Sequence, residues 1–317
     1  MGVRRYTNQK DNDQWAAVPL LSGAQQIKQT SSATPSGDTT TVHYGIKAKY
    51  DGKHSNGNYS NVITYSVVGN TPPVKDLGDI TYMQDVYTYS SIDLCGNSTP
   101  YSTGSKQYTL KDKRDNNSYT IRKLADGHCW MVQNLKLGKT SKMTLYNTDT
   151  DITDASWELP ASSGISGSST AAQMHNGASG DSGWTAIYGN YYTWPAAVAG
   201  KTVDSGDASV SICPKGWKLP KGNQNDYSWY KLYTTGYSSN DSSFRSATNT
   251  GTGYWSGYYG GNGLAYAGSE GRWWSRTTGS DSNSVYGLST ATGSGVYPRR
   301  SINKRYGFSV RCVLSSE

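Results

Sequence analysis

Four cysteines are the residues whose type and spacing most restrict the chemistry of this chain. Cys95, Cys129, Cys213 and Cys312 form an even set that contains no Cys-x-x-Cys pair. Structural zinc sites usually include such a close pair of ligands, so the spacing disfavours a metal centre. Two disulfides formed in an oxidising compartment explain the set more simply. Four cysteines allow three pairings, and their spacing does not choose among them.

The four histidines, His43, His54, His128 and His175, do not form a catalytic or metal-binding motif. The sequence has no His-Glu-x-x-His pair and no Gly-x-Ser-x-Gly turn that would present a nucleophile. We therefore predict that the protein is not an enzyme and carries no cofactor. The acidic run from Asp149 to Asp154 does not match an EF-hand, but its carboxylates could still bind a structural calcium ion.

The composition is typical of a binding protein with a core of aromatic rings. Only 34% of the 317 residues are hydrophobic, and Tyr (26) and Trp (10) far outnumber Phe (2). Such rings bury large areas but need hydrogen-bond partners at their polar ends. Tyr, Ser, Gly and Asn also dominate adaptable binding loops. The net charge is +7, but only 17% of residues are charged and the basic ones are scattered, which disfavours nucleic acid as a partner.

Hydrophobic segments bear on where the protein is located. The sequence contains no apolar run that could span a membrane, and no apolar segment typical of a signal peptide follows the first residues. We expect no membrane insertion. Together with the cysteines, this predicts an extracellular protein on a cell or virion surface, with the sequence beginning downstream of an export signal.

Two domains are predicted from the patterning along the chain. Residues 41–48 and 59–68 alternate like strands around an Asp/Gly/Asn turn, which predicts a hairpin within a small immunoglobulin-like β-sandwich, complete or truncated, over residues 1–70. Pro72 and Pro73 cannot continue a β-ladder, so residues 71–84 are predicted to be a linker. Residues 85–317 are predicted to form a second, ligand-binding domain.

The second domain is predicted to be α+β and loop-rich, with few short helices. Strands are expected at 85–89 and 307–313, a hairpin at 108–112 and 119–124, helices at 192–199 and 226–234, and irregular loops over most of 236–306. So much irregular structure requires a fold that anchors long loops with disulfides and tryptophans.

Four patches in this domain resemble one family. They are residues 119–135, 212–220 (with Cys-Pro-Lys-Gly-Trp-Lys-Leu-Pro), 272–277 (Arg-Trp-Trp-Ser-Arg-Thr) and 306–313 (Tyr-Gly-Phe-Ser-Val-Arg-Cys-Val). In this order they resemble the Fibrobacter succinogenes major paralogous domain family, over about residues 80–317. The resemblance implies a C-type-lectin-like fold, related to formylglycine-generating enzymes. The stretch His43–Val68 resembles the β-sandwich repeats that often precede this domain in cell-surface proteins.

The resemblance also implies a disulfide pairing. It favours Cys213–Cys312, which would join the middle of the domain to its C-terminus, and Cys95–Cys129. The formylglycine-generating relatives use cysteines at their active site, whereas here all four are expected to be structural.

Proteins of this fold include the variable proteins of diversity-generating retroelements, in which adenines of Asn-type codons are rewritten. Such codons cannot become Lys, Glu, Gln, Met or Trp, and residues 279–303 contain none of these five types. The resemblance therefore implies a variable segment at about residues 272–306. Trp217, Trp255, Trp273 and Trp274 are assigned to core and loop anchoring.

The predicted function is ligand binding by a surface-displayed receptor or adhesin, with a protein or glycan on another cell or host surface as partner. The alternatives are a calcium-dependent carbohydrate-binding lectin, although its Glu-Pro-Asn, Gln-Pro-Asp and Trp-Asn-Asp triplets are missing, and a structural cell-surface or virion protein. The candidate ligand-binding residues, expected to be exposed on one face, are Arg272, Ser275, Arg276, Ser280, Asp281, Ser282, Ser284, Val285, Tyr286, Ser289, Tyr297, Arg299, Arg300, Ile302, Arg305 and Tyr306.

Overall fold

The chain divides into two compact units, Met1–Pro73 and Val74–Glu317. The computed structural model describes residues 2–5, 14–17, 44–45, 76–89, 94–95, 100–101, 106–138, 141–176, 188–238, 241–249, 255–293 and 295–315.

The described part of the first unit is one small antiparallel sheet. It contains β1 (Gly2–Arg5), β2 (Gln14–Ala17) and β3 (Tyr44–Gly45) in the order β2-β1-β3. β3 falls within the first strand of the predicted hairpin, whereas β1 and β2 were not predicted. The rest of that hairpin, and with it most of the predicted immunoglobulin-like domain, lies outside the described residues.

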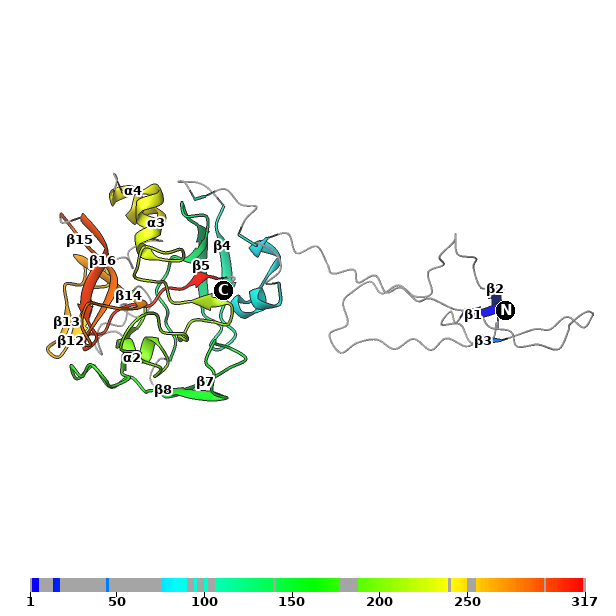
Figure 1. Ribbon diagram of the computed structural model, residues 1–317, viewed down its shortest axis with the longest axis horizontal. Coiled ribbons are helices and arrows are strands. Elements are labelled where there is room, and N and C mark those ends of the chain that lie inside the picture. The colour runs from blue at the N-terminus through cyan, green and yellow to red at the C-terminus, as the bar shows by residue number, and fades with distance from the viewer. Residues whose placement is uncertain are drawn as a thin grey trace, which may run out of the picture. The chain divides into compact units, whose positions relative to one another are not determined.

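The second unit is rich in short strands and loops and has few helices, which confirms the predicted α+β class at this level (Figure 1). Its helices are η1 (Leu77–Asp79) and η2 (Met83–Tyr89), both of the 3-10 type, and α2 (Trp194–Ala197), α3 (Trp229–Gly236) and α4 (Asp241–Ala247). Its strands are β4 (Tyr108–Lys111), β5 (Ser118–Lys123), β6 (Cys129–Met131), β7 (Met143–Tyr146), β8 (Ser156–Leu159), β9 (Met174–His175), β10 (Tyr191–Tyr192), β11 (Trp217–Lys218), β12 (Tyr258–Gly260), β13 (Gly263–Ala265), β14 (Glu270–Thr278), β15 (Ser284–Ala291), β16 (Gly295–Asn303) and β17 (Val313–Leu314).

A five-stranded antiparallel sheet joins the two ends of this unit. Its order is β11-β17-β6-β5-β4, so the C-terminal strand lies between strands from the middle and the start of the unit. The predicted hairpin is confirmed as β4 and β5, with Tyr108 opposite Ile121. The strand predicted over 307–313 is instead a series of isolated bridges, among them Tyr192–Phe308, followed by β17. The segment crosses several neighbours in turn and does not follow one partner strand.

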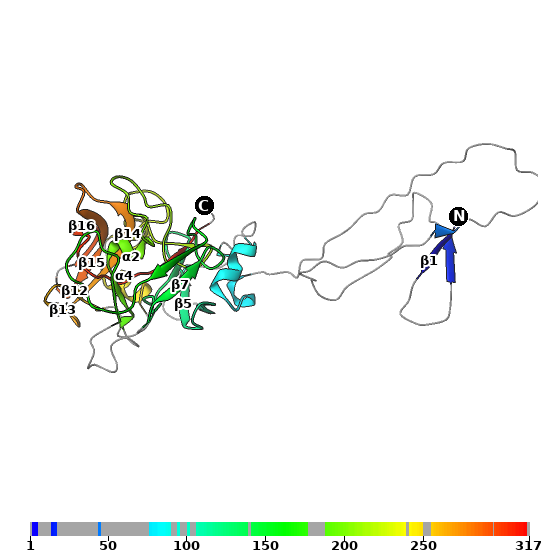
Figure 2. The ribbon, with the colours of Figure 1, turned by 90° about the horizontal axis from the view of Figure 1, so that it is seen from below.

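A second sheet, in the order β14-β15-β16, carries the predicted variable segment. Together with the hairpin β12–β13 it lies at the end of the unit away from β5 in both views (Figures 1 and 2). The prediction of irregular loops over 236–306 was therefore wrong for most of these residues. β14 and β15 are buried along most of their length and β16 has a run of exposed residues, so none of the three strands shows the regular alternation that identifies a half-exposed strand.

Helix positions differ from the sequence prediction in detail. α2 lies within the predicted helix 192–199, and α3 begins after Ser228, whose hydroxyl accepts a hydrogen bond from the N–H of Lys231 at 2.9 Å. The predicted strand 85–89 is wrong, because these residues belong to η2. The spacing of three between buried Met83 and Val86 fits one face of a 3-10 helix. The predicted linker 71–84 belongs to the folded unit from residue 76 onward.

Tryptophans connect the two cores of the second unit. Trp273 and Trp274 are adjacent on β14 and fully buried, but Trp273 packs in a cluster with Trp229 and Trp274 packs in the larger one with Phe308. The Trp273 indole donates to Asn134 Oδ1 at 2.7 Å and that of Trp274 to the Tyr192 carbonyl at 2.6 Å. The assignment of both tryptophans to the core is confirmed.

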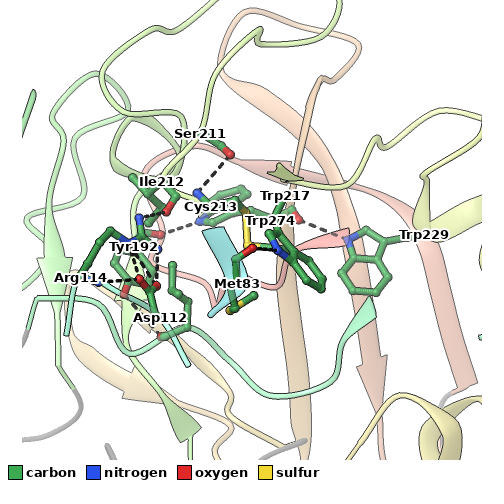
Figure 3. The surroundings of a disulfide bond; sticks show 12 residues. Met83, Asp112, Arg114, Tyr192, Ser211, Ile212, Cys213, Trp217, Trp229 and Trp274 are labelled. Carbon is green, nitrogen blue, oxygen red and sulfur yellow. Dashed lines mark hydrogen bonds and ion pairs between the residues drawn. A yellow bond between two sulfur atoms is a disulfide. The ribbon is translucent and has the colours of Figure 1, made fainter. Parts of the chain in front are cut away.

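Both implied disulfides are present, Cys95–Cys129 and Cys213–Cys312. Around the second bond, the Trp217 indole donates to the Met83 carbonyl at 2.9 Å and the Arg114 guanidinium donates to the Ile212 carbonyl at 2.7 Å (Figure 3). Arg114 also forms an ion pair with Asp112, whose side chain is fully buried. The bond thus lies beside a buried polar network that connects β4 to the Cys213 turn.

The turn between β5 and β6 contains a carboxylate with an unusual pKa. Burial raises the pKa of Asp126 to about 7, although its carboxylate accepts from the His128 N–H at 3.2 Å and from the Trp130 indole at 2.9 Å. A carboxyl whose pKa is higher in the folded state binds more protons there than in the unfolded state, so stability falls as the pH rises from about 4 to 7.

We therefore expect Asp126→Asn to raise the melting temperature at pH 8 and to raise it by much less at pH 5. The asparagine oxygen can still accept both hydrogen bonds. The stabilisation by the variant should be larger at pH 8 than at pH 5 by on the order of 2 kcal/mol. Thermal melts of the wild type and the variant across this pH range check it. An equal effect at both pH values would show that the charge of Asp126 is not responsible.

Candidate functional site

The predicted variable residues lie on β14, β15 and β16 and in the connections that follow them, but the structure does not expose all of them. Ser275, Arg276, Ser284, Val285, Ser289 and Ile302 are buried, so their prediction as exposed ligand contacts is wrong.

Packing within the sheet explains why these side chains are buried. Val285 lies opposite Ile302, and both belong to the larger core cluster. Ser289 is in the middle strand, between Arg272 of β14 and Tyr297 of β16. A side chain at Gly287 would lie 2.6 Å from the Trp273 carbonyl oxygen, so the middle strand has no room for one at that position. The interior of this sheet is therefore structural.

The remaining predicted residues reach solvent. Ser280, Asp281 and Ser282 form the exposed turn between β14 and β15. The other accessible members are the half-buried Arg272, Tyr286 and Tyr306 and the exposed Tyr297, Arg299, Arg300 and Arg305.

Tyrosine rings from the hairpin β12–β13 extend the accessible surface beyond the predicted segment. The Arg272 guanidinium lies 4.0 Å from the centre of the Tyr258 ring, and its charge is balanced by Glu270 at 2.7 Å. Tyr258 in turn contacts Tyr266, at 5.8 Å, and Tyr306, at 5.3 Å between ring centres. We call these five residues and Arg305 the tyrosine surface.

Tyr258 and Tyr266 were missed by the sequence analysis because they precede the segment. The only signal for them was the Tyr-rich composition around residue 260. Burial raises the pKa of Tyr258, with Arg272 opposing the shift, so its hydroxyl remains a neutral donor at physiological pH. A neutral hydroxyl beside a guanidinium can donate to a carbonyl or a carboxylate.

A bulge in β16 shapes the second part of the surface. Ser289 pairs with Tyr297 and Gly287 pairs with Arg300, so Pro298 and Arg299 together oppose the single residue Leu288. Such an extra residue interrupts the alternation and redirects the side chains that follow. It places Arg299 on the face of the sheet that carries Tyr286 and Leu288, whereas Arg300 lies on the opposite face, with Ser289.

Beside the bulge is an open depression of about 660 Å3, which we call the β16 depression. It is lined by Tyr230 of α3 and by Val296, Tyr297, Pro298, Arg299 and Arg300, among others. The Arg299 guanidinium lies 4.5 Å from the centre of the Tyr286 ring, and Arg300 donates to Ser289 Oγ at 3.2 Å. Stacking and hydrogen bonding thus hold both guanidinium groups in place.

A buried lysine supports the turn at the far end of the sheet. The Lys304 amine donates to the Ser282 carbonyl at 2.7 Å and lies 4.6 Å from the centre of the Trp194 ring. Burial lowers the pKa of Lys304, opposed by the charges of Asp204 and Asp281. Lysine is outside the set of residues that rewritten Asn-type codons can encode, so Lys304 is expected to be an unvaried position although it lies within the predicted segment 272–306.

The acidic run considered for calcium is engaged by lysines. Asp151 forms an ion pair with Lys218 at 2.7 Å, and Asp154 pairs with Lys201, also at 2.7 Å. Within the described ranges, no cluster of three or more His, Cys, Asp or Glu residues could hold a metal ion. The described histidines stack on tyrosines, His128 on Tyr227 and His175 on Tyr259.

No helix among the described residues has the length and apolar character needed to cross a membrane.

No protein-family model, curated protein or solved structure matches this chain.

Proposed function

We propose that the second unit is a C-type-lectin-like domain of the Fibrobacter succinogenes major paralogous type, which binds a protein or glycan ligand and is not an enzyme. In this proposal the protein is a receptor or adhesin on a cell or virion surface, and the first unit is an immunoglobulin-like spacer. The two disulfides fit an extracellular location. The resemblance of the four sequence patches supports the fold assignment.

One observation carries the binding proposal. Arg272, Ser289 and Tyr297 form a row across the three strands, and Arg300 donates to Ser289 in that row. Ser289 itself is buried, but Glu270, which pairs with Arg272 in the tyrosine surface, also lines the β16 depression, so the accessible Tyr and Arg side chains of the two areas adjoin. Tyr and Arg are the residue types that contribute most energy at protein interfaces.

We further propose that a diversity-generating retroelement varies this area. The accessible side chains can change without altering the core, because the sheet is anchored by the buried side chains of Trp273, Trp274 and Lys304 and their hydrogen bonds. A calcium-dependent lectin has less support, since the carboxylates of Asp151 and Asp154 already pair with lysines. A purely structural role would leave adhesion unchanged when the exposed residues Tyr297, Arg299 and Arg300 are replaced together by serine.

Sequencing of the locus and of its sister copies tests the retroelement. We expect a near-copy of the codons for residues 270–313 that differs at adenines, and a reverse-transcriptase gene close by. Variation is expected at accessible positions such as Arg272, Tyr297 and Arg299, with Trp273 and Lys304 unchanged. Absence of the template copy and of the gene would disprove retroelement diversification.

A further inference from the structure

The β16 depression combines positive charge with apolar walls. Among the described residues that line it, the only carboxylate is Glu270, and Arg272 binds that carboxylate at 2.7 and 3.0 Å. No described carboxylate lies within ion-pair distance of Arg299 or Arg300, which are both exposed. The depression therefore lies at a strand edge that carries one guanidinium group on each face, and no described carboxylate balances either charge.

The walls between these charges are suited to an apolar or aromatic side chain. Tyr230 lines the depression from α3, and Val296 and Pro298 line it from β16. Tyr297 is 47% exposed, so its ring is available for contact. A volume of about 660 Å3 lies in the range of sites that enclose several ligand groups.

We propose that the β16 depression binds an acidic polypeptide segment of a partner protein, in which Asp or Glu residues flank an apolar or aromatic one. This inference rests on the proposed binding function and specifies its partner. The guanidinium groups bind carboxylates through paired N–H donors, and the apolar side chain packs among Tyr230, Val296 and Pro298.

A polyanion without apolar groups fits the depression less well. Nucleic acids and sulfated glycans gain affinity from many basic contacts along a backbone, commonly about six to ten for nucleic acids. The depression offers two arginines, held in fixed positions by Tyr286 and Ser289. Guanidinium groups held in fixed positions next to apolar walls favour a short peptide motif, which is recognised by both its charges and its apolar side chain.

Protection of a sheet edge is a simpler explanation for part of this pattern. β16 is an outer strand, and proline and basic side chains often prevent such strands from pairing with other chains. Edge protection does not explain why both guanidinium groups stack on or bond to neighbours beside a hollow lined by Tyr230. It predicts association of the protein with itself on charge reversal, which size-exclusion chromatography would detect.

The test selects random peptides of about ten residues against the full chain by phage display. Enriched peptides should carry Asp or Glu beside an apolar or aromatic residue, and their binding should weaken with added salt. Arg299→Glu with Arg300→Glu should weaken binding of a synthetic enriched peptide about tenfold or more, and Arg299→Lys with Arg300→Lys should weaken it less. Lys142→Glu with Lys201→Glu makes the same change in net charge at exposed lysines outside the depression and should have no effect.

Three results would overturn the inference: enrichment of neutral or basic peptides, no enrichment, or binding that survives reversal of both arginines. Heparin binding without peptide binding would assign the arginines to a polyanion. Peptide binding lost in Tyr266→Ala with Arg305→Ala, but kept on reversal of both arginines, would disprove the acidic partner and retain the binding function. The locus sequencing test is independent of all these outcomes.

Discussion

Replacing Cys213 and Cys312 together with alanine is expected to lower the free energy of unfolding by about 4.7 kcal/mol. The bond closes a loop with a sequence separation of 99, and the unfolded chain gains the corresponding entropy when it is removed. It also holds the Cys213 turn, and the Asp112–Arg114 network beside it, to the C-terminal segment (Figure 3). Urea unfolding under non-reducing conditions measures the change.

The matched control removes Cys95 and Cys129, whose sequence separation is 34. The same loop-entropy relation gives about 3.8 kcal/mol for this bond, so the first variant should be less stable by about 1 kcal/mol. The opposite order would mean that native-state packing around Cys95–Cys129 outweighs the unfolded-state entropy.

Replacing Arg114 with methionine is expected to cost about 3–5 kcal/mol, because it leaves the buried Asp112 carboxylate without its cation. Burial of Asp112 opposes its ionisation, but the charge and hydrogen bonds of Arg114 hold its pKa below the usual value. This pair therefore contributes stability above pH 4, which is lost as the pH falls through the lowered pKa. Chemical unfolding at pH 7 measures the loss.

A double variant and a pH series separate charge from packing. Asp112→Asn with Arg114→Met should be more stable than Arg114→Met alone, because no unpaired charge is then buried. The asparagine oxygen can still accept a hydrogen bond from Gln84, whose Nε2 lies 2.7 Å from Asp112 Oδ1 in the wild type. In the single variant, burial without the cation raises the pKa of Asp112, so stability should recover as the pH is lowered from 8 to 5. No recovery would assign the loss to the packing of the Arg114 side chain.

The elements that could be predicted are those with a local signal. In β4, Tyr108 and Leu110 are buried whereas Thr109 and Lys111 are exposed, which is the alternation of a half-buried strand. The tryptophans could be assigned to the core because each of these rings buries a large apolar area. The disulfide pairing came from family resemblance, since spacing leaves three possibilities. The β14–β16 sheet had no such signal, because Gly287 and Ser289 occupy interior positions that elsewhere would be apolar.

The candidate site could be predicted as a segment but not as a surface. Which of its residues face solvent depends on the register of three strands and on the bulge opposite Leu288, and neither can be read from composition. The contributions of Tyr258 and Tyr230 depend on a hairpin and a helix that pack against the sheet from elsewhere in the chain. Residue types indicate that a Tyr- and Arg-rich segment binds, while tertiary packing decides which side chains do so.

The adjacent tryptophans Trp273 and Trp274 have a consequence for how much change the β14–β16 sheet tolerates. Because they enter two different cores, a shift of β14 by one residue would exchange their environments and disrupt both clusters. The backbone register is thus insensitive to what the solvent-facing side chains are. Exposed substitutions on such a sheet change stability by only about 0.5 kcal/mol, so many chemically distinct faces can occupy one unchanged backbone.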